Sequence, residues 1–272
     1  MKTMVVGDLH LKASVALPLI AATGARMGVG RYVLLGDVTD DWGASPELAM
    51  SELGVLADWK DAQEADGRQV ALLLGNHDHA YLARDPIRGT LTEALEKVRE
   101  MLLGLDPIAA VTVGPVLVTH AGVTEAWRSR HLPDAHTADE LAEGLNDTQA
   151  LLGWEALASC GGARGGRQIP GPLWADLREL AIDPAPGVDQ AVGHTPVPSV
   201  SRMATVGGRT LWACDTLSCT GSGTPLGDGT CLVLYDDGEG EVAFPFQDFW
   251  PELWRSGRWE RLKGIEPERG AR

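Results

Sequence analysis

The sequence lacks any segment that would enter a membrane or direct export. Nowhere among its 272 residues do about 18 apolar residues follow one another, as a membrane-spanning helix requires. The start, MKTMVVGDLH, places an acid and a histidine where a secretory signal needs its apolar stretch. We therefore expect a cytoplasmic protein with neither a membrane span nor a signal peptide.

Cysteine is also scarce, and its four positions form no CxxC pair: Cys160, Cys214, Cys219 and Cys231. A zinc site made of thiolates would need such paired spacing. In a chain without an export signal, reduced thiols are the default state. The sequence therefore favours scattered core and loop cysteines over a disulfide framework or a cysteine-based metal site.

Basic residues are also few in comparison with acidic residues. The chain has 23 Lys and Arg against 38 Asp and Glu, a formal net charge of −15. Such a surface repels nucleic-acid backbones unless a basic patch or bound cations reverse the sign locally. We expect no nucleic-acid partner. A cluster of buried acids that binds divalent metal would account for part of the acidic excess.

Short apolar runs alternate with helical patterns along much of the chain. The runs are typical of strands buried on both faces of a sheet and comprise residues 4–6, 32–35, 70–74, 116–119 and 190–192. Helices are predicted for residues 13–27, 45–66, 90–103 and 137–158, and a glycine-rich loop for 159–172. This alternation predicts an α/β layer structure.

After residue 200 the pattern changes to β-rich segments separated by glycine-containing turns. We predict that these segments form an antiparallel set of strands packed against the first sheet. They would complete a single domain over residues 1–249. Residues 250–272, with three tryptophans among charged residues, are predicted to form a C-terminal extension.

Each of the five strand-like runs ends in a residue of a metal-binding type. The segments are VVGDLH (5–10), LLGDVTD (34–40), LLGNHD (73–78), LVTHAG (117–122) and AVGHT (191–195). In open α/β sheets, sites assemble at the carboxyl ends of strands, and glycine there permits sharp turns and close approach. The side chains expected to converge are Asp8, His10, Asp37, Asn76, His120 and His194.

Each segment taken alone also has a structural explanation. The Asp-x-His pattern recurs at Asp134 and His136, in a polar stretch that no strand precedes. His120 could be a buried core histidine, and Asn76 could belong to an Asx turn. The joint pattern favours a functional site, because four of the seven histidines stand at strand ends: His10, His77, His120 and His194.

The order GDLH, GDVTD, GNHD, THAG and GHT resembles that of the calcineurin-like metallophosphoesterase superfamily. The resemblance is closest to the branch of phosphoprotein phosphatases and diadenosine-tetraphosphatase-like enzymes. It spans residues 6–234 and includes GPLWADL (171–177) and CDTLSCTGS (214–222). It implies a four-layer metallophosphoesterase fold, in which two packed mixed β-sheets are flanked by helices.

The resemblance implies a binuclear centre for two divalent transition ions. Asp37 would bridge both ions, and the remaining ligands would be Asp8 and His10 for the first, and Asn76, His120 and His194 for the second. Mn²⁺ is favoured, with Fe, Zn, Co or Ni as alternatives, because mixed oxygen and nitrogen ligands suit such metals better than Ca²⁺. Two ions clamp a phosphoryl oxygen, generate a hydroxide nucleophile and stabilise an in-line transition state.

Two further residues are implied to be catalytic. His77 adjoins a ligand but would face the leaving-group oxygen as the general acid, and Asp40 would orient it and keep it protonated. A purely structural contact is the alternative for His77. Asp78 and His79 are weaker candidates, and His79 is also consistent with a solvated helix start.

The sequence departs from the family pattern at the last motif. Where the wider superfamily has a second histidine in Gly-His-x-His, this chain has Pro196. The phosphoprotein-phosphatase branch shares this trait. The first ion would then have three protein ligands plus water, and such open coordination is what a hydrolytic metal needs.

A second departure concerns arginine. The branch usually has arginine directly after GDxxD and often before GNH, where this chain has Asp41 and Leu74. Arginine forks grip phosphate oxygens, so a replacement is expected. Arg164 and Arg167 of the glycine-rich loop are predicted to bind substrate, and Arg178 is a further candidate.

The sequence is consistent with three functions. The favoured one is a phosphomonoesterase acting on a phosphoprotein or a small phosphorylated metabolite, with a dinucleoside polyphosphate hydrolase as a close variant. The second is a nuclease or cyclic-nucleotide phosphodiesterase on the same metal core, which the net charge and the missing histidine oppose. The third is a non-catalytic scaffold, which would have no use for costly buried charges. The oligomeric state stays open as well.

Overall fold

The first sheet combines the apolar runs of the N-terminal third with the last two strands. In the computed structural model, which describes residues 1–247, its strand order is β10-β9-β1-β2-β3. Three of its strands are parallel: β1 (Lys2–Val6), β2 (Arg31–Leu34) and β3 (Gln69–Leu72). Two antiparallel strands extend it beyond β1: β9 (Cys231–Tyr235) and β10 (Gly240–Ala243).

The second sheet has the strand order β4-β5-β6-β8-β7. Its three central strands are parallel: β5 (Val116–Thr119), β6 (Asp189–Val192) and β8 (Thr210–Ala213). Its two edge strands are antiparallel to their neighbours: β4 (Ala110–Val113) and β7 (Ser201–Ala204). Both sheets are therefore mixed.

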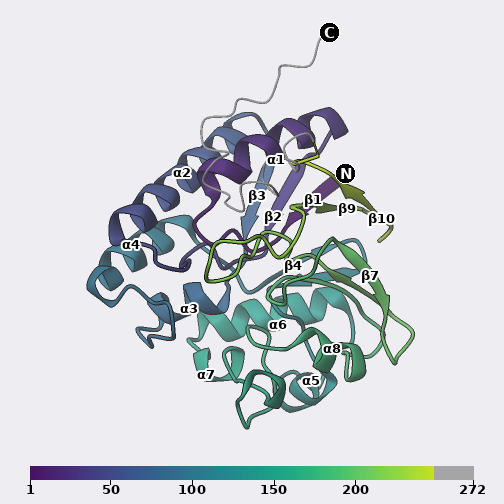
Figure 1. The fold of residues 1–272 in the computed structure, drawn as a ribbon. Coiled ribbons are helices and arrows are strands. Elements are labelled where there is room, and N and C mark those ends of the chain that lie inside the picture. The colour runs from purple at the N-terminus through teal and green to yellow at the C-terminus, as the bar shows by residue number, and fades with distance from the viewer. Residues whose placement is uncertain (248–272) are drawn as a thin grey trace.

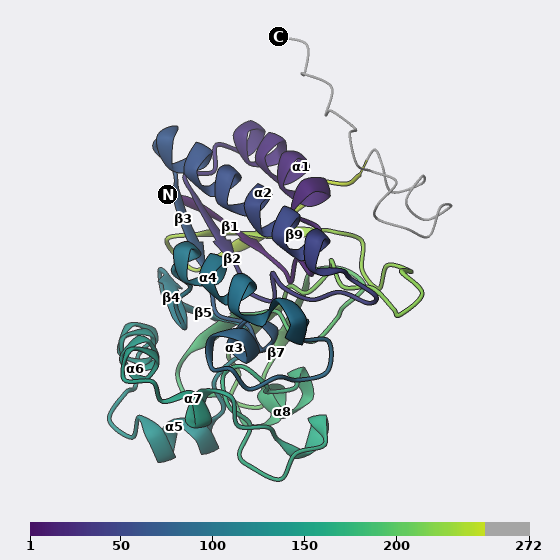
Figure 2. The ribbon, with the colours of Figure 1, turned by 90° about the vertical axis from the view of Figure 1, so that its left-hand side faces the viewer.

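Helices flank the two sheets in separate groups. The group beside the first sheet consists of α1 (Ala13–Met27), α2 (Pro46–Ala65) and α4 (Leu95–Leu105). The group beside the second sheet consists of α5 (Glu125–His131), α6 (Ala138–Ala150), α7 (Trp154–Leu157) and α8 (Leu177–Ile182). Figures 1 and 2 show α1 and α2 at one end of the molecule and α5 to α8 at the other.

Successive residues of β1 face different layers of the molecule. Met4 and Val6 belong to the apolar core that includes the helices, whereas Val5 belongs to a separate core. That second core takes side chains from both sheets, among them Val33, Leu73, Val118, Trp212 and Leu232. Strands buried on both faces read as continuous apolar runs. The predicted fold, two packed mixed sheets flanked by helices, is confirmed.

Two of the four predicted helices match closely. The helix predicted for residues 13–27 has these bounds, and the helix predicted for 45–66 spans Pro46–Ala65. Ser45 caps the latter by accepting a hydrogen bond from Leu48 N, and Pro46 occupies the first turn. The pattern of 90–103 instead contains a short 3₁₀ turn at Thr92–Ala94 before α4 begins.

The pattern of 137–158 is two helices. Thr137 caps the first in a capping box with Glu140, and this helix, α6, ends at Ala150. Leu152 then adopts a φ of 57°, and α7 begins at Trp154. A left-handed residue ends the helical hydrogen-bond series, so the apolar periodicity continues across a break in the backbone.

The prediction for the C-terminal strands was wrong in part. β9 and β10 do pack antiparallel in the first sheet, but β7 and β8 join the second, and β8 runs parallel to β6. An alternating pattern specifies which face of a strand is buried and leaves the neighbouring strand open. The predicted extension at 250–272 lies outside the described residues. Among residues 1–247, no helix is both long enough and apolar enough to cross a bilayer.

Candidate metal centre

Side chains at the ends of four strands meet at one point. Two groups of ligand atoms each lie within 4.8 Å of one another: Asp8, His10 and Asp37, and Asp37, His120 and His194. The carboxylate of Asp37 belongs to both groups. The sixth predicted residue adjoins them, because Asn76 Oδ1 lies 3.0 Å from His120 Nε2. The structure therefore brings together all six residues predicted as metal ligands.

The backbone at these strand ends adopts conformations that few residues other than glycine favour. His10, Asp37 and His194 have φ values of 41°, 47° and 62°. Such positive φ values cost free energy and are found where a site requires them. Adjacent glycines allow close approach: a Cβ on Gly75 would lie 2.1 Å from Asp37 Oδ1, and one on Gly193 would lie 2.2 Å from Asp8 Oδ1.

Backbone carbonyls fix the tautomers of two histidines. His120 Nδ1 donates to the carbonyl of Leu35 at 2.7 Å, and His10 Nδ1 donates to the carbonyl of Asp40 at 2.9 Å. A carbonyl oxygen only accepts, so both Nδ1 atoms carry the proton and each Nε2 presents a lone pair. These lone pairs face Asp37 Oδ2, at 3.5 Å from His120 and 4.0 Å from His10.

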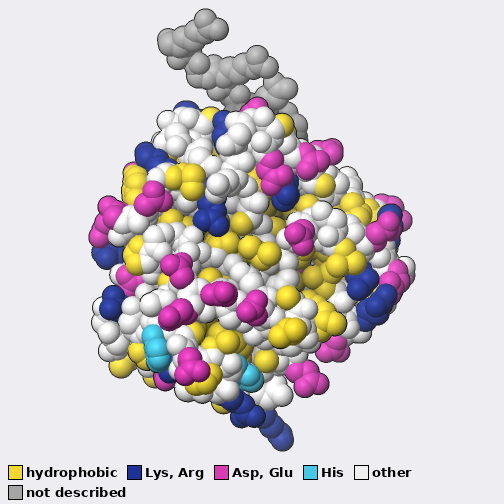
Figure 3. Space-filling view, turned by 180° about the vertical axis from the view of Figure 1, so that it is seen from behind, with side chains coloured by type: hydrophobic (Ala, Val, Ile, Leu, Met, Phe, Trp, Pro, Cys, Tyr) yellow, Lys and Arg dark blue, Asp and Glu magenta, His cyan; other side chains and the backbone are white. Residues whose placement is uncertain are grey.

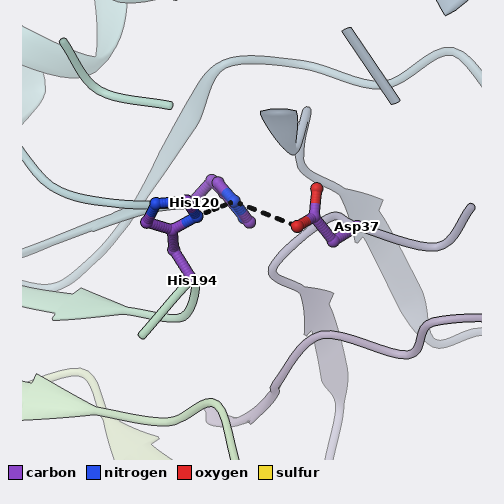
Figure 4. A group of neighbouring side chains, drawn as sticks. All are labelled: Asp37, His120 and His194. Carbon is purple, nitrogen blue, oxygen red and sulfur yellow. Dashed lines mark hydrogen bonds and ion pairs between the residues drawn. The ribbon is translucent and has the colours of Figure 1, made fainter. Parts of the chain in front are cut away.

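Figure 4 shows His120 between Asp37 and His194. His120 Nε2 lies 3.2 Å from His194 Nδ1. On the other side of the ring, His194 Nε2 is buried without a hydrogen-bond partner among the described residues. The backbone N–H of His194 donates to the carboxylate of Asp8 at 3.0 Å, and the ring of Trp174, from the GPLWADL segment, contacts the His194 ring edge-on.

The electrostatics of the cluster suit divalent cations. Burial, with the charges of Asp215 and Asp37, raises the pKa of Asp8 well above its usual value. Burial lowers the pKa of His10 to about 4 and that of His194 well below its usual value, so both rings are neutral near pH 7. Burial alone would raise the pKa of Asp37, but the neighbouring imidazoles outweigh it and lower that pKa. Carboxylates, an amide and neutral imidazoles fit a transition ion.

His77 stands beside the cluster in a chain of hydrogen bonds. Its Nδ1 lies 3.0 Å from Asp40 Oδ2, and Asp40 Oδ1 accepts from the hydroxyl of Tyr81. Burial would lower the pKa of His77, but the charge of Asp37 and the hydrogen bond and charge of Asp40 raise it to about 9. The His77 ring is therefore an imidazolium at neutral pH, with Nε2–H available for donation.

Asp78 joins two strand-end loops. Its Oδ1 accepts from Val38 N, Thr39 N and Thr39 Oγ1, and its Oδ2 accepts from Gly75 N, all at 2.8–3.1 Å. Four hydrogen bonds to one buried carboxylate hold the Asp37 loop against the start of α3 (Asn76–Leu82). Sequence reasoning gave Asp78 little weight. Its neighbour His79 is buried and contacts Trp154 edge-on, so the interpretation of His79 as a solvated residue at a helix start was wrong.

The structure brings one of the predicted substrate-binding arginines to the site. Arg164 Nη2 donates to Thr195 Oγ1 at 2.7 Å, next to His194, and its Nε lies 3.1 Å from Asp176 Oδ2. Arg167 instead lines a surface pocket with Arg130, His131 and Trp154, to which none of the six cluster residues contributes. Arg178, the further candidate, is exposed and bonds the same Asp176.

Asp41 replaces the expected arginine and forms an ion pair that the sequence did not reveal. Lys12 is buried, and its Nζ lies 3.0 Å from Asp41 Oδ2 and donates to the carbonyl of His10 at 3.0 Å. The charge of Lys12 lowers the pKa of Asp41 against the opposing effect of burial. The positive charge beside Asp41 is therefore that of Lys12, from the segment that follows β1.

Two mixed sheets present acids, an amide and imidazoles at their strand ends, an arrangement that fits a metal-dependent phosphoesterase. The model of the calcineurin-like phosphoesterase family matches residues 1–198, and the chain belongs to this family. The predicted superfamily is thereby confirmed, and the chain is a phosphoesterase of the calcineurin-like family. No protein of curated function matches the chain.

Solved structures match the chain at low sequence identity. The cold-active protein-tyrosine phosphatase of a psychrophilic Shewanella species is 19% identical, with a TM-score of 0.54 over 89% of this chain and 80% of that one. A dimetal phosphatase from Danio rerio is 13% identical, with a TM-score of 0.43 over 90% of this chain and 96% of that one. At such identities the first similarity supports the fold alone.

Proposed function

We propose that this chain is a binuclear metal-dependent phosphohydrolase that cleaves phosphomonoesters. The observation that carries the proposal is the position of Asp37, whose carboxylate belongs to both groups of converging ligand atoms. The proposed ligands are Asp8 and His10 for one ion, Asn76, His120 and His194 for the other, and Asp37 for both. Manganese is the proposed metal, and the substrate is a small phosphorylated metabolite or a phosphoprotein.

The two ions, when bound, would clamp a phosphoryl oxygen, activate water and stabilise an in-line transition state. His77 supplies the proton in this proposal. Its Nδ1–H is directed at Asp40, so Nε2–H is free to protonate the leaving-group oxygen. Tyr81 holds the Asp40 carboxylate from its other oxygen, which keeps the His77 ring in one orientation.

Arg164 is the proposed phosphate-binding residue. Its contacts with Thr195 and Asp176 fix the guanidinium beside His194, and its side chain is 25% exposed, so part of it faces solvent. A guanidinium fork complements the oxygens of a phosphate dianion. The geometry supports Arg164 in this role more strongly than Arg167, which lies in the pocket with Arg130 and His131.

The substrate class is tested on protein stripped with a chelator and refilled with Mn²⁺. The panel consists of p-nitrophenyl phosphate, its bis-ester, a phosphopeptide and a diadenosine polyphosphate. We expect hydrolysis of the monoester and little of the bis-ester. Preference for the bis-ester would indicate a phosphodiesterase, preference for the diadenosine compound a polyphosphate hydrolase, and inactivity with metal bound a scaffold.

The role of His77 is tested by His77→Ala on the same protein. We expect both ions to be retained and turnover to fall by about 10²–10⁴-fold, as for the loss of a general acid. The exposed His136, in the second Asp-x-His pattern, provides a matched control, because His136→Ala should change neither metal content nor turnover. Loss of metal from His77→Ala would make His77 a ligand instead.

A further inference from the structure

The loop between α3 and α4 borders the proposed general acid. A Cβ on Gly89 would lie 3.6 Å from both His77 Cε1 and Asp40 Oδ2, and Gly89 has a φ of 107°. The loop is anchored after this point, where Leu91 N donates to the hydroxyl of Tyr81 at 2.8 Å. The residue before Gly89 therefore lies close to the His77–Asp40 pair.

That residue is Arg88, and an exposed tryptophan holds its guanidinium. Arg88 Cζ stands 5.2 Å from the ring centre of Trp42, within the range of a cation–π contact. Trp42 follows Asp40 by two residues, and its Nε1 donates to the carbonyl of Cys219 at 3.2 Å. The ring is thus fixed at its edge although the residue is 56% exposed.

The charge of Arg88 is not neutralised within the described part of the chain. Arg84, in the same loop, pairs with Glu96 at 2.7 Å, and Arg164 pairs with Asp176 at 3.1 Å. Among residues 1–247, no carboxylate forms an ion pair with Arg88. Acidic side chains are spread over the face of the molecule seen from behind, in keeping with the net charge of −15 (Figure 3). An arginine left without a carboxylate in such a protein suits an anionic ligand.

We propose that Arg88 binds an anionic group on the leaving-group part of the substrate and that Trp42 positions it. The substrate class is a small phosphomonoester whose alcohol portion carries a second negative charge, a carboxylate or a phosphate. This proposal rests on the proposed function, because the assignment of His77 defines the leaving-group side. The guanidinium donates a fork of N–H groups to such an anion, while the indole face restrains its plane.

Two synthetic substrates differ mainly in the relevant charge: 4-carboxyphenyl phosphate and 4-carbamoylphenyl phosphate. With Mn²⁺-loaded protein, Arg88→Ala should raise the KM of the carboxylate about tenfold, as for loss of one charge-assisted hydrogen bond. The KM of the amide should change by less than about twofold. Arg202→Ala is the matched control, because Arg202 also stands over a tryptophan, Trp212, at 5.6 Å, but in the second sheet. It should change neither KM.

Trp42 is tested as a positioning residue. Trp42→Ala should raise the KM of the carboxylate substrate nearly as much as Arg88→Ala does, and Trp42→Phe should restore part of the difference because it keeps an aromatic face. Binding gives a second readout: calorimetry with 4-carboxybenzylphosphonate and 4-carbamoylbenzylphosphonate should show the same selective loss of affinity in Arg88→Ala.

The outcomes separate this inference from the proposed function. If the wild type hydrolyses neither phosphate, both are overturned. If the wild type hydrolyses both and Arg88→Ala changes them equally, or changes neither, only the role of Arg88 on the leaving group is overturned. A selective effect on the carboxylate compounds in both KM and dissociation constant supports the inference.

Discussion

The backbone N–H of His77 donates a 2.9 Å hydrogen bond to Asp37 Oδ1, while the other oxygen of Asp37 faces His120. The proposed general acid and the proposed bridging carboxylate are therefore parts of one hydrogen-bonded unit. A displacement of Asp37 would move the start of α3 and, with it, His77. This coupling makes the proton donor and the metal site interdependent in position.

Asp40→Asn should narrow the pH range of activity from its alkaline side. The charge of Asp37, together with the hydrogen bond and charge of Asp40, raises the pKa of His77. The acid form of His77 is the one that functions, so activity is lost as pH rises through that pKa. Without the carboxylate the pKa falls, and the alkaline limb of kcat should move about one to two units toward lower pH. The pH profile with bound Mn²⁺ checks this. If the alkaline limb of the kcat profile does not shift, the titration of His77 beside Asp40 is not its cause.

Asp78→Ala should destabilise the fold. It leaves the four donors of Val38, Thr39 and Gly75 without their buried acceptor. The free energy of unfolding should fall by about 3 kcal/mol, measured by urea denaturation of metal-free protein. The exposed Asp134 gives a control, since Asp134→Ala should change it by less than about 0.5 kcal/mol. Equal stability of the two variants would contradict the role of Asp78.

His79 should make stability depend on pH. Burial lowers the pKa of His79 to about 4, against the opposing charge of Asp85, whereas the unfolded chain titrates near its usual 6.5. The folded state binds the proton less readily than the unfolded state does. The contribution of neutral His79 to the free energy of unfolding is therefore fully present above about pH 6.5 and is lost as pH falls toward 4.

His79→Phe keeps an aromatic ring and removes the titration. Between pH 7 and pH 5 the wild type should lose about 2 kcal/mol more of its free energy of unfolding than the variant does. Denaturant titrations at several pH values in metal-free protein measure the difference. Parallel pH dependences would show that His79 accepts a proton in the folded state.

Arg164→Ala should weaken substrate binding, whereas Arg178→Ala should not. Both side chains bond Asp176, but Arg164 also bonds Thr195 beside His194, and Arg178 is 77% exposed. The KM for p-nitrophenyl phosphate should rise about tenfold in the first variant and stay within about twofold in the second. Similar KM values for the two variants would remove Arg164 from the phosphate site.

The fold class could be predicted because local patterns agree with it. Continuous apolar runs indicated strands covered on both faces, and Ser45 with Pro46 marked a helix start that the structure confirms. The helix break at Leu152 could not be predicted, because a left-handed residue interrupts the backbone while the apolar periodicity continues. The pairing of β8 with β6 could not be predicted either, because it depends on contacts between distant segments.

The convergence of the cluster was predictable for the same reason. Its six residues follow strands of both sheets: Asp8, His10, Asp37 and Asn76 in the first, and His120 and His194 in the second. Neighbouring strands bring their carboxyl ends together within each sheet, and the packing of the two sheets brings the two sets into contact. Three further side-chain contacts could not be predicted, because no sequence pattern pairs residues that lie far apart in the chain. They are the ion pair of Lys12 with Asp41, the hydrogen bond of Tyr81 to Asp40 and the cation–π contact of Arg88 with Trp42. For Arg164 and Arg167, composition favoured both equally, and only the chain path placed the former beside His194.

The metal content of the protein tests the central proposal most directly. After removal of metal and reconstitution with Mn²⁺, elemental analysis should find two ions per chain in the wild type and in His136→Ala. Asp37→Ala should hold fewer than one, because the lost carboxylate belongs to both groups of ligand atoms. A wild type with less than one ion, or an Asp37→Ala variant that keeps two, would contradict a centre bridged by Asp37.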